Sequence, residues 1–577
     1  MSHHKRDAID MMKELVELTI LDEGDPQSFR VRAYEQAMAA LEAFEGDLGS
    51  MKASELTKLK GIGKSTAEKL RELFETGRVT KLEGLRAKHP ASVVALMKIP
   101  GLGPKAVARL RAELGVVDLD TLKAAVREQK IRALKGFGQK TEENLTRVLE
   151  RLERDGGEKR TPLSVALPLA ERLVGELRSV PGVQHVQYCG SLRRFSETVG
   201  DLDIVVAAET PSLVFDRLVS LPVFESVIVR GEKKTSMRTR RGLQVDCRVV
   251  AKRELGAALM YFTGSKGHNI RLRQRALDRG WTLNEYALSE IESGKIVAQE
   301  TEEAIYDALG LAWIPPHLRE DGGEIELAER RALPKPIDGT ALMGDFHVHT
   351  TLSGDGRSSL DDMLNHARER GYKVVAITEH AEDLAMSGVS REKLLDQREK
   401  IRAAQAAHGD ALRILHGVEL NIGKDGSLDY DPAFRETFDF CLASVHEHFD
   451  LGRDAQTARI VRAMEDPAVN MIGHLSARMI GARPGIELDM AKVFDAAERT
   501  GTAIEINGSL PRLDASASVV RDAKSRDITF VLTSDAHHTT ELDQIQNARM
   551  VAEKSTIDPS RIANTWSAAK ILQWVAG

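Results

Sequence analysis

Cysteine is scarce in this sequence, and long apolar runs are absent. The three cysteines, Cys189, Cys247 and Cys441, lie far apart and form no C-x-x-C pair, which argues against a disulfide framework and a thiolate zinc site. No stretch approaches the roughly 18 apolar residues of a membrane-spanning helix. The first residues, MSHHKRDAIDMMKEL, lack the basic and then apolar order of a secretory leader. We therefore expect buried thiols, no membrane insertion and a cytoplasmic location.

The length and the charge distribution indicate several domains of different character. A chain of 577 residues exceeds one ordinary hydrophobic core, so about three to five domains are expected. The net charge of -6 is unevenly spread, because residues 336–577 carry 27 Lys and Arg against 37 Asp and Glu, whereas residues 1–335 carry 54 against 50. A mildly basic front and an acidic back are compatible with DNA binding by the first part and metal binding by the second.

Residues 5–150 have helical periodicity and contain three similar segments, in each of which an apolar residue stands between two glycines before a helix. The segments are LKGIGKSTAEKLREL (59–73), IPGLGPKAVARLRAEL (99–114) and LKGFGQKTEENLTRVL (134–149), with glycines at Gly61, Gly63, Gly101, Gly103, Gly136 and Gly138. Backbone N–H groups of such a turn and of the next helix N-terminus can hold phosphate oxygens. A plain turn between helices is the alternative for one copy, and the threefold repetition favours phosphate binding.

A polar segment, RLERDGGEKRTPLS (151–164), separates this helical part from a mixed one. We expect a helix at about 166–179 on one face of an antiparallel sheet, and helical sequence again at 254–279. The expected strands are VQHVQYC, DIVVAA, SVIVRG and LQVDCRVV.

Three acids in this mixed part indicate a metal site. In GSLRRFSETVGDLDIVV (190–206), Asp201 and Asp203 face the same side of a strand, and Asp246 of LQVDCRVV can lie beside them on a neighbouring strand. Three carboxylates on adjacent strands suit a pair of Mg²⁺ or Mn²⁺ ions. Upstream, the N–H groups of Gly190 and Ser191 stand where a strand turns into a helix, and with Arg194 they can hold a phosphate.

From residue 343 on, seven apolar strands alternate with amphipathic helices, which predicts an α/β barrel. Nearly every strand ends in histidine or acid, and such strand ends form the active sites of these barrels. Nine nitrogen and oxygen ligands suit two or three Zn²⁺, Mn²⁺ or Fe²⁺ ions, whereas packing alone does not explain so many histidines at equivalent ends. The nine are His347, His349, Asp355, His380, Glu419, His446, His474, Asp535 and His537.

Taken together, GS-x-RR, G-D-x-D, the strand acid and YFTGSKGHNIRLR (261–273) resemble a family X DNA polymerase over residues 5–330. The resemblance implies that Asp201, Asp203 and Asp246 bind two metals and that Asp246 helps deprotonate the primer 3′-hydroxyl. The implied nucleotide and template contacts are Gly190, Ser191, Arg194 and Gly200 at the triphosphate, Tyr261 and Phe262 at the sugar, Asn269 at the base, Arg273 at the template, and Gly264 in the same segment. Phe195 departs from the pattern, because a small residue is common there.

The first glycine segment resembles the 5′-deoxyribose phosphate lyase motif of the same family. The resemblance places Lys69 at the Schiff-base position and Arg30 and Tyr34 near the 5′-phosphate, while Ser65 replaces a supporting lysine. A solvated helix lysine is the alternative for Lys69.

The C-terminal part resembles the PHP (polymerase and histidinol phosphatase) domain, a distorted seven-stranded barrel, and has all nine ligand positions of that pattern. The resemblance implies a metal-dependent phosphoesterase that removes nucleotides from 3′ ends, with cleavage at abasic sites as a further candidate. Arg478 and Arg483, which follow His474, are candidate phosphate contacts, with ordinary surface arginines as the alternative.

We thus expect a multidomain enzyme that fills short gaps in DNA repair, acting as a monomer on gapped or nicked DNA and dNTPs. Two alternatives remain open: a PHP phosphoesterase tethered to DNA by a weak polymerase-like module, and a non-enzymatic DNA-end scaffold. The expected parts are an all-α helix-hairpin-helix lyase-like domain (1–85), helix-hairpin-helix fingers (86–155), an α+β nucleotidyltransferase palm (156–252), a thumb (253–335) and an α/β PHP barrel (340–577).

Overall fold

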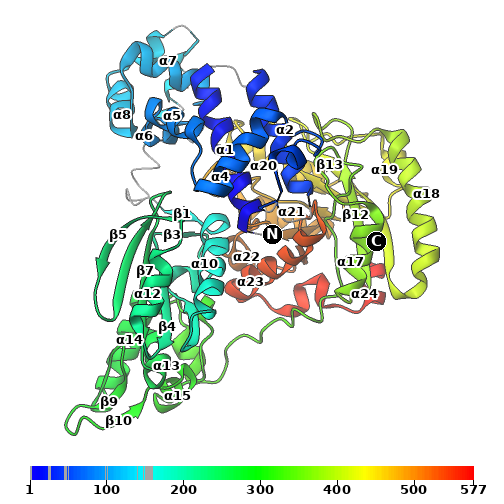
Figure 1. Cartoon of the computed structure of the whole chain (residues 1–577). Coiled ribbons are helices and arrows are strands. Elements are labelled where there is room, and N and C mark those ends of the chain that lie inside the picture. Colours follow the sequence, from blue (N-terminus) through cyan, green and yellow to red (C-terminus); the bar gives the residue numbers. More distant parts are fainter. Residues whose placement is uncertain are drawn as a thin grey trace. The chain divides into compact units, whose positions relative to one another are not determined.

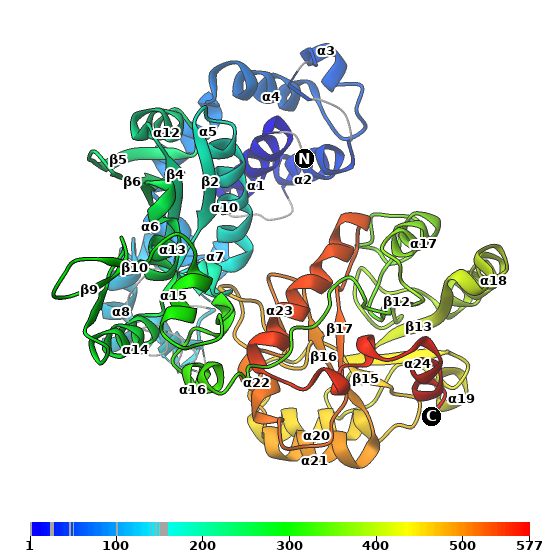
Figure 2. The same cartoon turned by 90° about the horizontal axis from the view of Figure 1, so that it is seen from below.

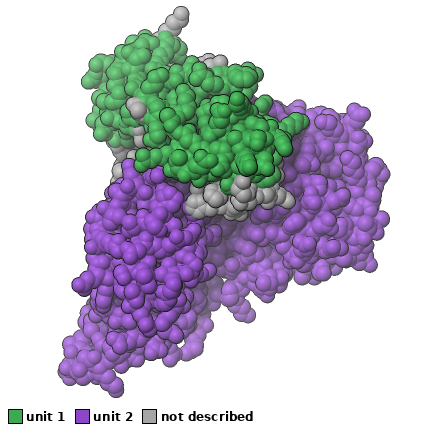
Figure 3. Space-filling model, viewed as in Figure 1, with its two compact units in different colours: residues 1–159 green, residues 160–577 purple. Residues whose placement is uncertain are grey.

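The computed structural model describes residues 3–577 except 24–27, 45–47, 50, 98, 100–101, 135, 140, 144, 147–148 and 150–159. The chain divides into two compact units, residues 1–159 and residues 160–577, shown in separate colours in Figure 3. Among the helices of the described residues, none is both long enough and apolar enough to cross a membrane.

The first unit is helical, as the periodicity predicts, and has two separate apolar cores. Met12, Leu15 and Leu70 belong to the first core, and Leu110 and Leu122 belong to the second. Its elements are α1 (His3–Glu23), α2 (Phe29–Ala43), α3 (Ala53–Leu56), α4 (Lys64–Thr76), α5 (Thr80–Lys88), α6 (Ala91–Leu96), α7 (Pro104–Leu114), α8 (Leu119–Arg127) and η1 (Ile131–Ala133).

The second unit begins with a five-stranded sheet in the order β2-β4-β7-β6-β5, of which Figure 1 labels β4, β5 and β7. It lies in the part of the chain expected to be the palm, and we use that word for it below. Its elements are β1 (Thr161–Pro162), α10 (Leu163–Arg178), β2 (Val183–Tyr188), α11 (Gly190–Arg193), β3 (Thr198–Val199), β4 (Asp201–Ala208), α12 (Pro211–Val219), β5 (Phe224–Arg230), β6 (Lys234–Thr239) and β7 (Gln244–Val250). The sheet is not wholly antiparallel as expected, because β4 and β7 run parallel. The chain returns to β7 through α12, β5 and β6, and β6 is a strand that the sequence pattern did not reveal.

The part expected to be the thumb, called the thumb below, follows the palm and contains a three-stranded antiparallel sheet in the order β10-β9-β8. The helical stretch expected at 254–279 is broken, because Gly264 has φ +69° and Ser265 begins a new helix by accepting a hydrogen bond from the His268 N–H. The elements are η2 (Lys252–Glu254), α13 (Leu255–Thr263), α14 (Lys266–Leu277), β8 (Trp281–Leu283), β9 (Leu288–Glu290), β10 (Ile296–Ala298), α15 (Glu302–Ala308), η3 (Pro316–Leu318) and α16 (Glu324–Glu329).

A buried ion network joins the palm to the thumb. Glu302 pairs with Arg193 of α11 at 2.8 Å and with Arg319 at 2.6 Å. Burial alone would raise the pKa of Glu302, but the two guanidinium groups lower it to about 2. This doubly paired carboxylate fixes α11 against the thumb.

The C-terminal part is the expected barrel, with seven parallel strands in sequential order. A parallel bridge between Val348 and Ala536 brings its first and last strands together. Phe346 and Phe440 fill the interior and pack against Trp574. The strands are β11 (Gly344–Asp345), β12 (Val374–His380), β13 (Arg413–Asn421), β14 (Phe440–Ser444), β15 (Met471–Ile472), β16 (Ala503–Asn507) and β17 (Phe530–Thr533).

Helices and turns surround these strands, and the palm and the barrel share one apolar cluster. The α-helices are labelled in Figure 2. The helical elements are α17 (Leu360–Glu369), α18 (Arg391–His408), η4 (Gly409–Ala411), α19 (Pro432–Arg435), α20 (Arg453–Met464), α21 (Met490–Thr500), α22 (Ala517–Asp522), η5 (Thr539–Gln544), α23 (Ile545–Ser555), η6 (Pro559–Arg561), η7 (Ala563–Thr565) and α24 (Ala568–Val575).

Candidate functional site

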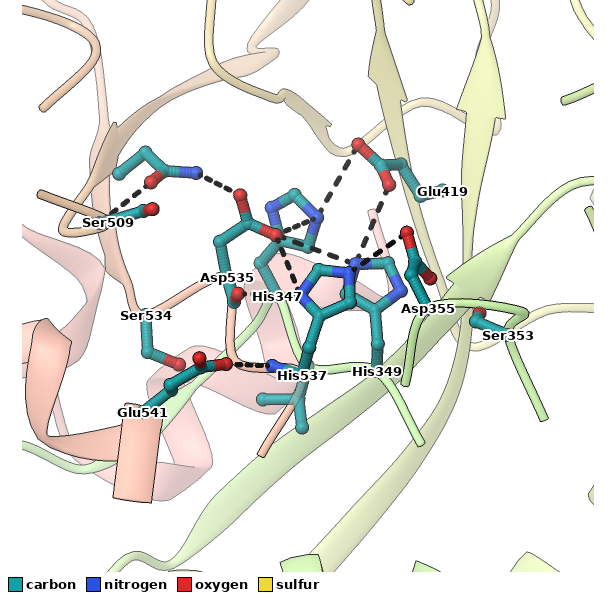
Figure 4. Close-up of polar contacts among 12 residues, drawn as sticks. His347, His349, Ser353, Asp355, Glu419, Ser509, Ser534, Asp535, His537 and Glu541 are labelled. Carbon is teal, nitrogen blue, oxygen red and sulfur yellow. Dashed lines mark hydrogen bonds and ion pairs between the residues drawn. The ribbon is translucent and has the colours of Figure 1, made fainter. Parts of the chain in front are cut away.

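The expected barrel ligands lie together at the carboxyl ends of the strands. His347 and His349 follow β11, His380 ends β12, and Glu419 lies near the end of β13. Asp355 lies in the loop between β11 and α17, and the remaining four follow later strands: His446, His474, Asp535 and His537. Because parallel strands end at one edge, residues far apart in sequence converge there. Figure 4 shows the rings of His347, His349 and His537 and the carboxylates of Asp355, Glu419 and Asp535 turned toward one another.

Glu419 is the centre of this cluster. Its Oε1 lies 3.0 Å from His474 Nε2, 3.2 Å from His446 Nε2 and 3.4 Å from His347 Nε2. Its Oε2 lies 2.7 Å from His380 Nδ1 and 3.6 Å from His349 Nε2. One buried carboxylate therefore faces five imidazoles.

Two further carboxylates complete the cluster. Asp535 Oδ1 lies 3.5 Å from His347 Nε2 and 3.6 Å from His349 Nε2. Asp355 Oδ2 lies 3.3 Å from His380 Nε2 and 3.6 Å from His537 Nε2. Three overlapping sets have ligand atoms close enough to share an ion: His349, His380 and His537; His347, His349 and Asp535; and His380, Glu419 and His446.

The protonation of the cluster follows from its burial and its acids. Burial disfavours a charged His347, but Asp535, Glu505 and Glu419 outweigh it and raise the His347 pKa well above its ordinary value. Burial and the neighbouring His537 and His380 lower the pKa of His349, which holds that ring neutral, the form that ligates metal. The buried carboxylates of Asp535, Glu505 and Glu419 thus need a positive charge beside them to stay ionised.

The donor set fits divalent cations. Among the residues that the structure describes, neither ring nitrogen of the fully buried His349 has a hydrogen-bond partner, and neither has Nε2 of His347. Buried polar atoms without partners cost stability unless a ligand satisfies them. Imidazole nitrogens and carboxylate oxygens are the ligands that Zn²⁺, Mn²⁺ and Fe²⁺ accept.

The palm acids also converge. Asp203 of β4 is the register partner of Asp246 on β7, and Asp201 lies two residues before Asp203 on the same strand face. Burial, followed by repulsion from Asp201 and Asp246, raises the pKa of Asp203 to about 7. Burial also disfavours an ionised Asp246, but hydrogen bonds from Lys234, Ser236 and Gln244 hold its pKa below the ordinary value. Lys234 Nζ lies 2.6 Å from Asp246 Oδ2.

The loop before β4 lies against these acids. Gly190 begins α11 with φ +62°, and a Cβ on it would lie 2.9 Å from Asp203 Oδ2, so glycine is required at this position. Ser191 is in the same short helix, and Gly200 immediately precedes β4. Arg194 ends α11, and its Nη1 donates to the Thr263 carbonyl at 2.6 Å. Phe195, the departure from the family pattern, has φ +55°.

The expected base and sugar contacts gather on the thumb. Asn269 Nδ2 donates to the Tyr261 carbonyl at 2.8 Å, and the Arg273 guanidinium lies 5.1 Å from the Tyr261 ring centroid. These three residues line one small pocket. Phe262 faces the other way, with Arg248 4.5 Å from its ring centroid.

The three glycine segments share one turn. The residue between the glycines donates its N–H to the carbonyl three residues earlier, as Ile62 to Leu59, Leu102 to Ile99 and Phe137 to Leu134. Gly63 and Gly103 then cap α4 and α7 at their N-termini, Gly61 and Gly136 have φ of +103° and +91°, and Gly138 accepts from the Glu142 N–H. Gly101 lies outside the described residues.

Lys69 of α4 lies beside Tyr34. Its Nζ donates to Ser65 Oγ at 2.7 Å and lies 5.8 Å from the Tyr34 ring centroid, and burial lowers its pKa. Arg30 is exposed and pairs with Glu23 at 2.9 Å.

Comparison with known proteins identifies the family. The chain is 35% identical over 568 residues to the DNA polymerase/3′-5′ exonuclease PolX of Bacillus subtilis, and the match covers 98% of each chain. The chain belongs to the PolX family. The chain is also similar to a probable phosphatase of Shewanella sediminis, at 30% identity over 38% of this chain and 88% of that protein. A probable phosphatase of Vibrio parahaemolyticus matches at 26% identity over 40% of this chain and 91% of that protein.

Family models match separate parts of this PolX-family chain and confirm the expected fold classes. The matched descriptions are Helix-hairpin-helix domain (residues 3–79), SAM-like Helix-hairpin-helix tandem (93–151), DNA polymerase beta thumb (258–320) and PHP domain (345–509). The polymerase and PHP families are metal-dependent, which agrees with the donor clusters.

Residues that the sequence interpretation missed contact the expected ligands of this PolX-family barrel. Glu505 of β16 lies 2.6 Å from His347 Nδ1 through Oε1, and its Oε2 accepts from the His474 N–H. Asn421 Oδ1 lies 2.7 Å from His446 Nδ1, and Asp429 accepts from the Asn421 side chain. Such partners fix ring orientation and strengthen metal ligands. The one available signal was the acid inside the apolar strand GTAIEING.

Arg478 and Arg483 are engaged away from the ligands. Arg478 makes two hydrogen bonds to Glu197 of the palm, at 3.0 and 2.8 Å, so its guanidinium links the barrel to the palm. Its contact with a phosphate stays a prediction. Arg483 lies 3.9 Å from the Phe449 ring centroid and donates to the Ala477 carbonyl.

The raised pKa of Asp203 predicts a pH-dependent stability of the metal-free protein. The pKa of Asp203 in the folded state, about 7, exceeds its ordinary value of 3.8, so between these pH values the folded state binds more protons than the unfolded state. The free energy of unfolding therefore falls as the pH rises from 3.8 to about 7, and stays reduced above it. In chelator at about pH 8, Asp203→Asn should therefore melt above the wild type, and the difference should narrow toward about pH 5. Differential scanning fluorimetry checks this, and equal melting temperatures at the higher pH would contradict it.

Proposed function

We propose that this chain fills short gaps in DNA by metal-dependent nucleotidyl transfer in the palm and removes nucleotides from 3′ ends in the barrel. The observation that carries the proposal is the presence of two separate and complete acidic donor sets on one chain. Asp203 faces Asp246 in register on the palm sheet, and Glu419 lies among five imidazoles in the barrel. The match to PolX along nearly the whole chain supports both activities.

In the palm, Asp201, Asp203 and Asp246 would hold two Mg²⁺ or Mn²⁺ ions. When bound, the ions neutralise the triphosphate and orient the attacking and leaving oxygens. Asp246 accepts the proton of the primer 3′-hydroxyl. The role of Asp203 is to remain ionised, which the bound positive charge favours against its raised pKa.

The nucleotide would be held by the loop and the thumb. The N–H groups of Gly190 and Ser191 at the start of α11, together with Arg194 and the backbone at Gly200, hold the triphosphate. Tyr261 and Phe262 pack on the sugar, Asn269 contacts the base beside Gly264, and Arg273 contacts the template. The pocket shared by Tyr261, Asn269 and Arg273 supports this arrangement.

In the barrel, the nine ligands would hold two or three Zn²⁺, Mn²⁺ or Fe²⁺ ions. When bound, the ions polarise the scissile phosphate and supply a nucleophile near neutral pH. Glu505 and Asn421 hold His347 and His446 in the orientation that ligation needs.

We further propose that the three glycine turns bind the DNA backbone and that the protein acts as a monomer in the cytoplasm. The repeated turn hydrogen bond leaves the following N–H groups at the start of a helix, as phosphate binding requires. The residues that would contact the DNA backbone in this part are the described glycines together with Arg30 and Tyr34.

Lys69 is the residue proposed to form a Schiff base with a 5′-deoxyribose phosphate end. Burial lowers its pKa and thereby favours the neutral amine that attacks an aldehyde. Borohydride reduction should cross-link the wild-type protein to a 5′-labelled abasic end. Lys58→Ala, a control at an exposed lysine, should give the same amount of adduct. Lys69→Ala should yield a small fraction of it. Equal adduct in Lys69→Ala would contradict the assignment.

The function is tested on a primer that borders a single-nucleotide gap, with Mg²⁺ or Mn²⁺. With dNTPs the primer should gain one nucleotide, and without dNTPs it should become shorter. Degradation without incorporation would instead select the tethered phosphoesterase. Salt-sensitive binding without either reaction would select the DNA-end scaffold.

A further inference from the structure

A lysine of the barrel reaches the triphosphate loop of the palm. Lys554 lies near the end of α23, a helix that Figure 2 shows on the side of the barrel toward the palm. Its Nζ donates to the Arg194 carbonyl at 2.9 Å and lies 3.0 Å from Glu320 Oε1. The Lys554 side chain is 17% exposed and that of Glu320 is 37% exposed, so the lysine is the more shielded partner. Neither contact belongs to the barrel's own metal cluster.

The two contacts of Lys554 act on the same arginine. Glu320 Oε1 also lies 3.3 Å from Arg194 Nε, so Lys554 and Arg194 share one carboxylate. Without the lysine, the Glu320 carboxylate would pair with Arg194 alone and would compete with an incoming triphosphate for that guanidinium. The lysine therefore leaves more of the arginine's charge for a phosphate.

The backbone at this point needs external support. Phe195, which directly follows the Arg194 carbonyl, has φ +55°, a backbone conformation that residues other than glycine seldom adopt. Its ring packs against the apolar cluster shared by the palm and the barrel. Lys554 fixes the carbonyl on one side of this residue, and the packing fixes the ring on the other.

The barrel also holds the far end of the loop. Arg478 makes its two hydrogen bonds to Glu197, three residues after Arg194. The helix that carries Lys554 is itself held to the preceding linker, because Glu553 accepts a hydrogen bond from the Ile337 N–H at 2.9 Å. Loop residues 194–197 are thus held at both ends by barrel side chains.

We propose that Lys554 is a positioning residue for nucleotidyl transfer, through which the barrel holds Arg194 ready for the triphosphate. The proposal rests on the proposed contact between Arg194 and the triphosphate. It gives the barrel a part in synthesis that is separate from its own hydrolytic site.

The test compares kcat and KM for dNTP on the single-nucleotide gap with full-length variants. Lys554→Met should raise KM for dNTP by about tenfold with a smaller change in kcat, because ground-state binding of the triphosphate is weakened. Lys554→Arg, which keeps the charge and the donors, should restore KM. Lys524→Met, at an exposed lysine that contacts Thr556, is the matched control and should leave KM unchanged.

A second substitution separates positioning from general damage to the fold. Adding Glu320→Gln to Lys554→Met removes the competing carboxylate and should bring the raised KM part of the way back to the wild-type value. A merely structural role would not produce this coupling. An unchanged KM in Lys554→Met, or no recovery in the double variant, would overturn the proposal. Arg194→Gln tests the underlying function separately. A raised KM in Arg194→Gln together with a wild-type KM in Lys554→Met would contradict only the positioning role. An unchanged KM in Arg194→Gln would contradict the triphosphate contact itself.

Discussion

Asp203→Asn should lower the rate of single-nucleotide incorporation by about 10³-fold and leave 3′ degradation unchanged. The substitution keeps the size of the side chain but removes the central charge of the three palm acids. The neighbours of Asp203 are Asp246 in register on β7 and Asp201 on the same strand, and two carboxylates alone bind a metal pair poorly. Single-turnover incorporation on the gapped primer measures the effect.

The matched control for this prediction is Asp216→Asn. Asp216 lies on α12 of the same domain, is 62% exposed and pairs only at the surface with Arg230. It should incorporate nucleotides at the wild-type rate. An Asp203→Asn rate within about tenfold of the wild type would contradict the two-metal account of the palm.

Glu419→Gln should abolish 3′ degradation, to below about one-thousandth of the wild-type rate, and should reduce the metal content of the protein. The physical reason is the central place of this carboxylate, whose two oxygens lie within 3.6 Å of five imidazoles. Gln offers one neutral oxygen and an amide group that cannot ligate. Release of labelled nucleotide and elemental analysis of the purified protein measure the two effects.

Glu399→Gln is the control for the barrel. Glu399 lies on α18, is 69% exposed and pairs with Arg402 on the same helix. Its metal content and degradation rate should equal those of the wild type, and both variants should retain incorporation. Full degradation by Glu419→Gln would show that the cluster is not the hydrolytic site.

Much of the barrel site was predictable because one rule generates it. Parallel strands end at one edge, so histidines and acids that end apolar strands in the sequence must meet in space, as His347, His380 and Glu419 do. The palm acids were predictable for a related reason, since Asp201 and Asp203 share a strand face by their spacing.

The missed features depend on contacts that have no periodicity. Strand β6 has exposed and buried residues without regular alternation. Its place beside β7 results from a reversal of the chain after β5, a strand whose residues are mostly exposed. Glu505 resembles any strand acid until the fold brings it to His347, and Lys554 resembles any helix lysine 360 residues from its partner. Such long-range pairs are set by tertiary packing, which local sequence patterns do not encode.

The central claim is that the barrel removes what the palm adds, and a primer ending in a 2′,3′-dideoxynucleotide tests it most directly. Such a primer lacks the 3′-hydroxyl, so extension requires prior removal of its last nucleotide. With dNTPs the wild type should fill the gap, Asp203→Asn should only shorten the primer, Glu419→Gln should leave it unchanged, and a mixture of the two variants should restore filling. Extension of this primer by Glu419→Gln alone, or its persistence with wild type that extends ordinary primers, would contradict the account.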